Sequence, residues 1–266
     1  MNIIVCVKQA TDPEAPPSSF KIDPAGHKMV TTAGVPLVID PYSEYAVEAA
    51  LRIKDAFGGT VTTISLGANL LPDIVKKPLA MGTDQLILLE DEEFADGDSY
   101  STASALAAAI KKIGDYELIL CGREAADTNA GQVGPAIAEM LGRPSITLVK
   151  KIAVSQGKAK VERVTDDGYE VIEVALPALL TVSHEIGEPR YPTIKRSLMA
   201  KKIEPTVWKP ADIGLAAAQV GATGRRSKIV RLFQPVRDVK CEIIDGESAE
   251  EAGVNLALRL REAKLI

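Results

Sequence analysis

The sequence predicts an α/β fold: a doubly wound, mainly parallel, Rossmann-like sheet covered by helices on both faces. Two observations support this prediction. Short apolar runs alternate four times with stretches of helical periodicity, and the connections between them are short. The first run, residues 1–7, is also continuously apolar rather than alternating, as expected of a strand that is buried on both faces of a parallel sheet.

The first elements follow from local signals. Residues 1–7 are apolar and rich in β-branched side chains, which predicts a buried strand, and residues 12–33 are rich in Pro, Ser and Gly, which predicts a long excursion. A helix is expected to begin at Asp40, where a capping-type residue precedes Pro41, and to end at the glycine pair that starts at Gly58.

The same alternation continues along the chain. Strands are predicted at residues 60–66, 85–89, 117–121 and 145–149, and helices at residues 71–81, 99–113 and 131–141. The helix over residues 71–81 is expected to bend at Pro78, because proline removes a backbone N–H and crowds the preceding turn.

The pattern changes after Lys150. Short β-branched runs at residues 160–165, 169–175 and 178–183 predict a small antiparallel extension of the sheet. From Glu185 onward, prolines, basic residues and weak periodicity predict an arm that does not pack on its own core. We therefore divide the chain into residues 1–183, 184–203 and 204–266.

Composition argues against several functions. The chain has 266 residues, a net charge of −5 and only 4% aromatic residues, so neither a basic surface nor a base-stacking platform for nucleic acid is expected. The longest early apolar run, residues 3–7, is too short for a signal sequence or a membrane span. We expect a cytoplasmic protein.

The chemistry-bearing residues are sparse. Cys6, Cys121 and Cys241 are scattered without a CxxC pair, and His27 and His184 lie in no arrangement typical of a triad or a zinc site. No metal site and no catalytic residue is therefore predicted.

One stretch is unusual, the loop between the strand at 117–121 and the following helix. The strand stops at Gly122, charged and small residues follow, and Gly131 and Gly134 open a helix whose amides and dipole favour an anion such as phosphate. The motif is neither a P-loop nor GxGxxG, and Asp127 suits ribose hydroxyls. The residues alone leave two interpretations open: an adenine-nucleotide loop, or a tight turn followed by a glycine helix cap.

Six segments together resemble the β subunit of electron-transfer flavoproteins. In chain order they are VCVKQATDPEA, DPYSEYAVEAALRIKD, LAMGTD, LILCGREAADTNAGQVGPAIAEMLGRP, VERVTDDGYEVIEVALPALLTV and GEPRYPTIKRSLMAKK. The similarity extends from residue 1 to about residue 202 and continues more weakly to the C-terminus. The fold of this family agrees with the predicted alternation of strands and helices.

The resemblance implies a heterodimer with an α subunit that holds the redox FAD mainly in its own C-terminal domain. Residues 1–183 would bind an adenine nucleotide, which is AMP in ordinary members and a second FAD in electron-bifurcating members that oxidise NADH. The residues assigned to this pocket are Cys6, Asp40, Pro41, Tyr42, Ser43, Leu66, Gly122, Arg123, Glu124, Ala125, Ala126, Asp127, Thr128, Asn129, Ala130, Gly131, Gln132, Val133 and Gly134.

The resemblance also implies surfaces for protein partners. Residues 184–203 would form a partner-recognition loop and basic segment for an acyl-CoA dehydrogenase-type flavoenzyme, and residues 204–266 would be an arm that packs on the α subunit. Ile186 stands where a protruding leucine docks, and the neighbouring docking residues are Glu188, Pro189, Arg190 and Tyr191. The basic residues Lys195, Arg196, Lys201 and Lys202 either form a solvated face or steer an acidic partner.

Three functions remain open at this point. The first is a simple carrier that passes electrons between acyl-CoA dehydrogenase-type flavoenzymes and a downstream acceptor, and transforms no substrate itself. The second is the bifurcating β subunit, because FQPVRDVKCEIIDGES resembles bifurcating members whereas EPRYPTIKRSLMAKK resembles ordinary ones. The third is a stand-alone nucleotide-binding stress protein or an ATP-using ligase, which would explain only residues 1–149.

Overall fold

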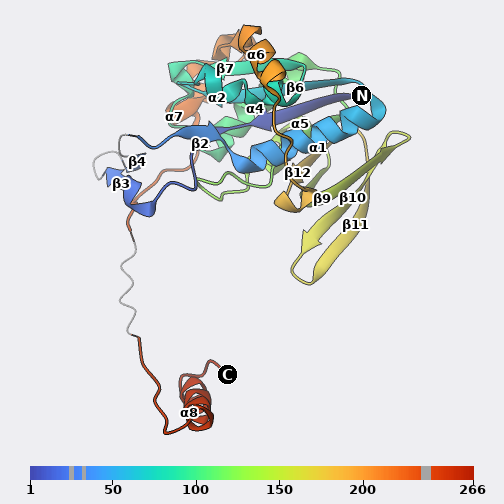
Figure 1. The fold of residues 1–266 in the computed structure, drawn as a ribbon. Coiled ribbons are helices and arrows are strands. Elements are labelled where there is room, and N and C mark those ends of the chain that lie inside the picture. The colour runs from blue at the N-terminus through green and yellow to red at the C-terminus, as the bar shows by residue number, and fades with distance from the viewer. Residues whose placement is uncertain (24–26, 32–33, 235–240) are drawn as a thin grey trace. The chain divides into compact units, whose positions relative to one another are not determined.

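The computed structural model describes residues 1–23, 27–31, 34–234 and 241–266. These residues fall into two compact units, residues 1–230 and residues 231–266. Within the described part of the first unit, nine strands form one sheet in the order β11-β10-β9-β12-β8-β1-β6-β7-β13 (Figure 1).

Most of this sheet is parallel, as the sequence predicts. Its strands are β1 (Asn2–Val7), β6 (Thr60–Gly67), β7 (Gln85–Glu90), β8 (Leu118–Gly122), β9 (Ser145–Ser155), β10 (Lys158–Thr165), β11 (Gly168–Ala175), β12 (Ala178–Val182) and β13 (Thr206–Trp208). All neighbouring strands pair in parallel except β9 with β10 and β10 with β11, which are antiparallel. The predicted α/β fold class is confirmed.

One predicted strand lies in a different place. Residues 178–183 were expected in the antiparallel extension, but β12 lies between β8 and β9 and pairs in parallel with both. The physical reason is burial: every residue of Ala178–Val182 is buried, as is required of a strand covered on both faces, whereas an edge extension leaves one face exposed. The extension is instead the long strand β9 continued into the β10–β11 hairpin.

The helices of the first unit cover both faces of the sheet (Figure 1). They are α1 (Pro41–Phe57), α2 (Pro72–Val75), α3 (Lys77–Met81), α4 (Ser99–Ile113), α5 (Val133–Leu141), α6 (Ile194–Lys202) and the single turn α7 (Gly221–Gly224). The expected bend at Pro78 is instead a break into two short helices at Lys76, with Pro78 in the first turn of α3. Proline suits a helix start better than a helix interior, because its missing N–H has no partner there anyway.

The remaining elements are short. Two small antiparallel sheets pair β2 (Gln9–Thr11) with β5 (Leu37–Ile39) and β3 (Phe20–Asp23) with β4 (Lys28–Thr31). The 3₁₀ turns are η1 (Pro17–Ser19), η2 (Glu92–Phe94), η3 (His184–Ile186), η4 (Pro210–Ile213) and η5 (Ala217–Gln219).

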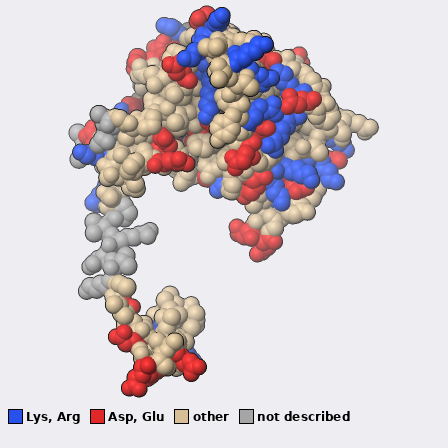
Figure 2. Space-filling view, in the orientation of Figure 1, with Lys and Arg blue, Asp and Glu red and all other residues tan. Residues whose placement is uncertain are grey.

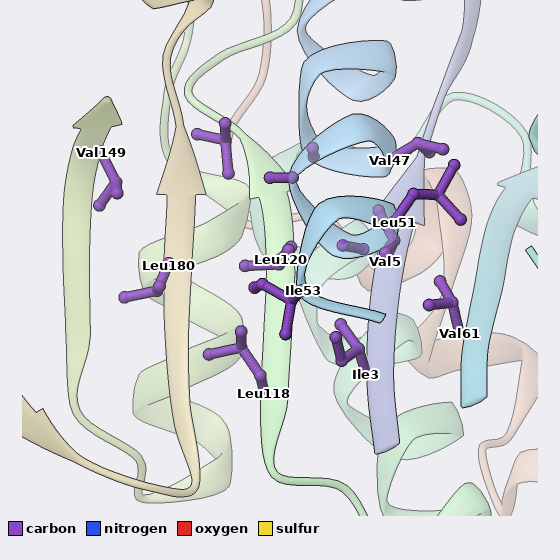
Figure 3. Packing of buried hydrophobic residues seen from close by; sticks show 14 of the residues in the cluster. Ile3, Val5, Val47, Leu51, Ile53, Val61, Leu118, Leu120, Val149 and Leu180 are labelled. Carbon is purple, nitrogen blue, oxygen red and sulfur yellow. The ribbon is translucent and has the colours of Figure 1, made fainter. Parts of the chain in front are cut away.

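The core has two apolar layers, one on each face of the sheet. Alternate side chains of the central strands, including Ile3, Val5 and Leu120, pack against α1 (Figure 3). The intervening side chains, such as Ile4 and Ile119, pack on the opposite face with residues of α4 and α5. This alternation is the two-residue period of a strand, and it explains why both faces of strands such as β1 and β8 carry apolar side chains.

The segment after Glu185 packs on its own chain further than expected. β13 adds to the edge of the sheet beside β7, and Ile213 and Val220 are buried in the second apolar layer. These anchors lie in a short strand and in 3₁₀ turns, where helical or strand periodicity gives no signal. The first unit therefore extends to residue 230, beyond the boundary expected at residue 204.

The second unit contains one helix, α8 (Ala249–Glu262), among its described residues. Its apolar side chains Val254, Leu256 and Leu258 are exposed, and none of its residues is buried. Val239, one of the apolar residues of the predicted arm, lies outside the described residues. No helix in the described ranges is long and apolar enough to cross a membrane.

Asp98 fastens the end of the first unit to the start of α4. Its carboxylate accepts hydrogen bonds from the amide of Ser101, which caps α4, and from the amides of Arg226 and Ser227 at 2.8 Å each. Burial raises the pKa of Asp98, but these hydrogen bonds outweigh it and hold the pKa well below its usual range. The ionised form therefore stabilises the fold.

We expect Asp98→Ala to lower the free energy of unfolding by about 1–3 kcal/mol at neutral pH, because a helix cap and the tie to residues 226–227 are both lost. The difference should shrink as pH falls below about 4, where Asp98 becomes protonated in the unfolded chain and then in the folded chain. Urea unfolding at pH 7, 5 and 3.5 measures this. As a control, Asp73→Ala, whose carboxylate is 84% exposed, should change stability by less than about 0.5 kcal/mol. An equal loss at all three pH values would contradict the assignment.

Candidate functional site

The residues assigned to a nucleotide pocket converge on one edge of the sheet. β1, β6 and β8 are neighbouring parallel strands, so their carboxyl ends at Val7, Gly67 and Gly122 lie side by side. Cys6 and Leu66 belong to this edge. In open parallel sheets, ligands bind at this edge, beyond the carboxyl ends of the strands.

The two cysteines at this edge are plain buried thiols. Cys6 and Cys121 lie on adjacent strands and are both buried, whereas Cys241 is exposed. The hydrogen bond with Cys6 and the burial of the site together raise the pKa of the Cys121 thiol, which keeps it neutral. These side chains contribute packing rather than a charged ligand.

Asp40 fixes the loop after β8 to the start of α1. Its Oδ1 accepts from the amides of Tyr42 and Ser43, at 3.0 and 3.4 Å, and its Oδ2 accepts from the amide of Ala126 at 2.7 Å. Burial raises the pKa of Asp40, and these three hydrogen bonds offset part of that effect. Both carboxylate oxygens have partners within the protein, so Asp40 positions the loop and the start of α1.

The first part of the loop is held by further contacts. The amide of Arg123 donates to the carbonyl of Val182 at 2.9 Å, and the Arg123 guanidinium pairs with Glu124 at 3.0 Å and lies over the Tyr42 ring. The amide of Asn129 donates to the carbonyl of Ala125 at 2.7 Å. Residues 123–126 are half-buried and residues 127–130 are exposed, so the tip of an anchored loop faces solvent.

Lys8 is a member of this site that the sequence analysis did not assign. It follows β1 directly, and its ammonium lies 2.7 and 2.8 Å from the two carboxylate oxygens of Asp127. The pair places a positive charge beside the loop at the sheet edge. A signal was present in the sequence, because Lys8 is the polar residue that ends the first apolar strand.

The helix that follows the loop begins without a side-chain cap. Gln132 at the N-cap position of α5 makes no capping hydrogen bond, and the first amides of a helix have no partners within the helix. Gly131 has a φ of 60°, a left-handed conformation that suits glycine. These features leave backbone donors and the positive end of the helix dipole available to an anion.

Gly134 has a different reason to be glycine. A Cβ at this position would lie 2.6 Å from Cγ2 of Thr181 on β12 and 3.6 Å from Cβ of Cys121 on β8. The missing side chain lets α5 pack closely on the sheet. Packing against the protein is thus one reason for glycine at this position, and the contribution of Gly134 to the nucleotide site stays a prediction.

The polar groups at this edge fit a nucleotide. The Ser65 hydroxyl, in the residue before Leu66, is buried and has no hydrogen-bond partner among the described residues. The uncapped start of α5 supplies donors for phosphate oxygens, and the exposed loop tip supplies polar groups for hydroxyls. No group of three or more His, Cys, Asp or Glu side chains within the described ranges is arranged to hold a metal ion.

A separate hollow of about 310 Å³ lies against α6. It is lined by apolar residues of β5 and α3, such as Ile39 and Ala80, and by Lys76 and Lys201 at its rim. The residues assigned to the nucleotide do not line it.

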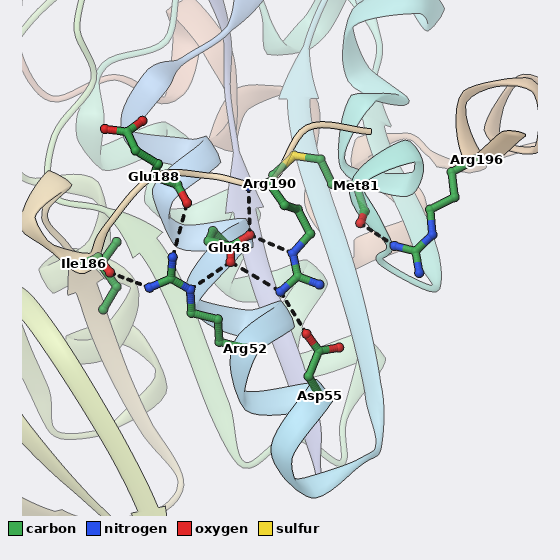
Figure 4. Close-up of polar contacts among 8 residues, drawn as sticks. All are labelled: Glu48, Arg52, Asp55, Met81, Ile186, Glu188, Arg190 and Arg196. Atoms are coloured by element: carbon green, nitrogen blue, oxygen red, sulfur yellow. Dashed lines mark hydrogen bonds and ion pairs between the residues drawn. The ribbon is translucent and has the colours of Figure 1, made fainter. Parts of the chain in front are cut away.

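The recognition segment is anchored at its start and exposed at its end. Ile186 is half-buried and packs against the first apolar layer, and the Arg190 guanidinium binds Glu48 and Asp55 (Figure 4). Tyr191, in contrast, is 95% exposed and Ile194, the first residue of α6, is 83% exposed. Glu188 is exposed and Pro189 half-buried.

Ile186 is half-buried and does not protrude from the body of this chain. Its carbonyl is held by Arg52 at 2.6 Å, and its side chain packs on the core. The exposed apolar residues of the segment come later, and they are Tyr191, Ile194, Leu198, Met199 and Ile203. Exposure of this kind depends on which face of a short helix packs inward, and the weakly periodic sequence of α6 does not reveal it.

The basic residues of α6 divide into two kinds. Arg196 donates to the carbonyl of Met81 at 2.8 Å and so holds α6 on the body (Figure 4). Lys195, Lys201 and Lys202 are exposed. Lys and Arg side chains gather on the face that carries α1 and α6, although the whole chain is acidic (Figure 2).

Comparison with known proteins identifies the family. Residues 28–213 match the electron transfer flavoprotein domain. The chain belongs to this family. It is 40% identical to the electron transfer flavoprotein subunit beta of Thermoanaerobacterium thermosaccharolyticum and 38% identical to the caffeyl-CoA reductase-Etf complex subunit CarD of Acetobacterium woodii, over 100% of both chains in each case. It is 32% identical to protein FixA of Azorhizobium caulinodans, over 97% of this chain and 93% of that protein.

Membership has direct consequences. The full-length similarity is to β subunits of electron-transfer flavoproteins, so the chain is an electron-transfer protein of the β-subunit type. The alternative of a stand-alone nucleotide-binding protein is set aside, because the similarity includes the C-terminal residues that it left unexplained.

The packing of Gly134 can be tested directly. We expect Gly134→Val to lower the free energy of unfolding by about 1–3 kcal/mol, because the new side chain must displace Thr181 or move α5. Gly142→Ala at the other end of α5 serves as a control: its Cβ would meet no atom within 4 Å, although its φ of 63° imposes a smaller backbone cost. Thermal unfolding of both variants with and without added AMP measures the effect. A Gly134→Val protein of unchanged stability that has lost its nucleotide would favour the ligand interpretation instead.

Proposed function

We propose that this chain is the β subunit of a heterodimeric electron-transfer flavoprotein, and that it binds AMP at the carboxyl edge of its sheet. The observation that supports this most strongly is the uncapped start of α5, held at the strand ends by the contact between Asp40 and Ala126. An anion at that helix end would receive backbone donors without any rearrangement of the loop.

The proposed roles of the residues follow from their positions. The amides of residues 131–134 would hold the phosphate, and Lys8 would add a positive charge close to it. The exposed loop tip at residues 127–130 would bind the ribose hydroxyls. Bound FAD, which the α subunit would hold mainly in its own C-terminal domain, supplies the electron chemistry, and the residues of this chain supply binding and shape.

We further propose that α6 docks an acyl-CoA dehydrogenase-type flavoenzyme. Tyr191 and Ile194 present exposed apolar surface that the fold of this chain does not use. The exposed Lys195, Lys201 and Lys202 beside them would steer an acidic partner. Ile194 thereby replaces Ile186 as the proposed anchor.

A second candidate function is electron bifurcation, in which this subunit would hold a second FAD and the complex would oxidise NADH. It is favoured by the resemblance of residues 233–248 to bifurcating members of the family. The two candidates differ in what occupies the same edge of the sheet.

Cofactor content distinguishes them. For the heterodimer purified with its α subunit, we expect one FAD and one AMP, measured by absorbance and by chromatography of the acid-released nucleotides. We also expect NADH to leave the flavin oxidised. Two FAD per heterodimer, with flavin bleaching on addition of NADH, would establish the bifurcating function instead.

The C-terminal unit is proposed to pack on the α subunit. Its helix α8 exposes Val254 and Leu258, which lie one turn apart on the same face. A chain ending at Val230 should keep the first unit folded, because residues 1–230 are a compact unit, and should lose at least about tenfold in affinity for the α subunit.

A pair of substitutions tests the same surface without shortening the chain. Val254→Asp together with Leu258→Asp should weaken the heterodimer, whereas Arg261→Ala in the same helix should change it little. Analytical ultracentrifugation of the co-expressed subunits provides the measurement. Full affinity after truncation at Val230 would show that α8 contributes nothing to pairing.

A further inference from the structure

A buried carboxylate on α1 organises the chain that leads to the docking helix. Glu48 is only 4% exposed. Its Oε1 accepts from Nε of Arg52 at 2.8 Å, and its Oε2 accepts from the amide and Nε of Arg190 at 3.0 and 2.8 Å (Figure 4). One acidic side chain therefore binds an arginine of its own helix and an arginine of the recognition segment.

Arg52 uses its remaining donors on the recognition segment itself. Nη1 donates to the carbonyl of Ile186 at 2.6 Å and Nη2 donates to the carbonyl of Glu188 at 3.2 Å. Between these two carbonyls lies Gly187, with a φ of 104°. Its backbone lies close to the Arg52 guanidinium, and a Cβ at this position would lie 3.1 Å from Nη1. The planar guanidinium thus holds two carbonyls of one turn at fixed spacing.

Glu48 is held in its ionised form by its two arginine partners. Burial raises the pKa of Glu48, but the hydrogen bonds from Arg190 and Arg52 outweigh it and leave the pKa below its usual value. Glu48 is thus an ionised group whose orientation is set by the two arginines, and it orients them in return. Arg190 has a second partner in Asp55, which is 61% exposed, whereas Arg52 relies on Glu48 for its ion pair.

We propose that Arg52, oriented by Glu48, is a positioning residue for partner docking. By fixing the carbonyls of Ile186 and Glu188, it sets the direction in which Tyr191 and Ile194 leave the body of the protein. The contact of Arg196 with Met81 fixes the far side of the same segment, so the apolar docking residues are held between two arginine ties. This inference rests on the proposed docking role of α6.

The test uses the complete heterodimer, co-expressed with its α subunit, and a short-chain acyl-CoA dehydrogenase kept reduced by butyryl-CoA as the probe. Arg52→Ala should raise the KM for the dehydrogenase about tenfold and leave kcat within about twofold, because two carbonyl contacts are lost while the flavin is untouched. Arg52→Lys keeps the charge but not the paired donors, so it should raise KM by a smaller factor, about threefold.

The matched control is Lys54→Ala, on the same helix. Lys54 likewise binds a carbonyl and a carboxylate, those of Gly82 and Asp84, but it does not touch the recognition segment. Its KM should stay within about twofold of the unmodified protein. Hydrogen exchange of the amides of residues 186–188 should accelerate in Arg52→Ala and not in Lys54→Ala.

Ile194→Asp separates the inference from the function on which it rests. If Ile194→Asp raises KM while both Arg52 variants leave it unchanged, the docking surface stands and the positioning role is overturned. If Ile194→Asp leaves KM unchanged, the docking surface itself is wrong, and the inference fails with it. If Arg52→Lys lowers kcat and the melting temperature without raising KM, Arg52 is a structural residue and the positioning role is overturned.

Discussion

Burial of the central strands on both faces is the constraint on which the rest of this structure depends. Parallel strands need crossover connections, and the helices of those connections cover the two faces of the sheet. The carboxyl ends of β1, β6 and β8 consequently share one edge, where the chain can only leave as loops. The site is located there because helices cover the strands along their length, so a ligand can reach their backbone only at the strand ends.

Three carboxylates convert this framework into shaped surfaces. Asp40 accepts an amide of the loop after β8, Glu48 accepts an amide of the recognition segment, and Asp98 accepts amides at the end of the first unit. Each acidic residue lies in a helix or at its start, and each partner is more than 80 residues away along the chain. Segments without regular structure thereby acquire defined positions. A buried carboxylate that loses its hydrogen-bond donors destabilises the fold, because charge-assisted hydrogen bonds are strong and an unpaired buried charge is costly.

The sequence predicts the parallel sheet, the major helices and the capped start of α1, because these depend on local periodicity and capping chemistry. It misplaces β12, because the slot between β8 and β9 is decided by topology, which a five-residue apolar run does not encode. Within the site, the glycines of residues 122–134 predict the loop. The close packing of Gly134 against Thr181 is not predicted, because Thr181 belongs to a strand that is distant in the sequence. The same holds for the turn at Ile186, whose carbonyl is held by Arg52, 134 residues earlier in the chain.

The place of β12 also constrains how the chain reaches its folded state. β8 and β9 both precede β12 in the chain, but they do not pair with each other, because β12 lies between them. A nascent chain that ends before residue 178 therefore carries open strand edges on β8 and β9 and an incomplete apolar layer on each face. Closing that gap is a non-local step, which is slow compared with forming the helices and exposes the edges to other chains while it is pending. The edge of the sheet at β8 is thus completed only when β12 has paired with both of its neighbours, after the β9–β11 excursion.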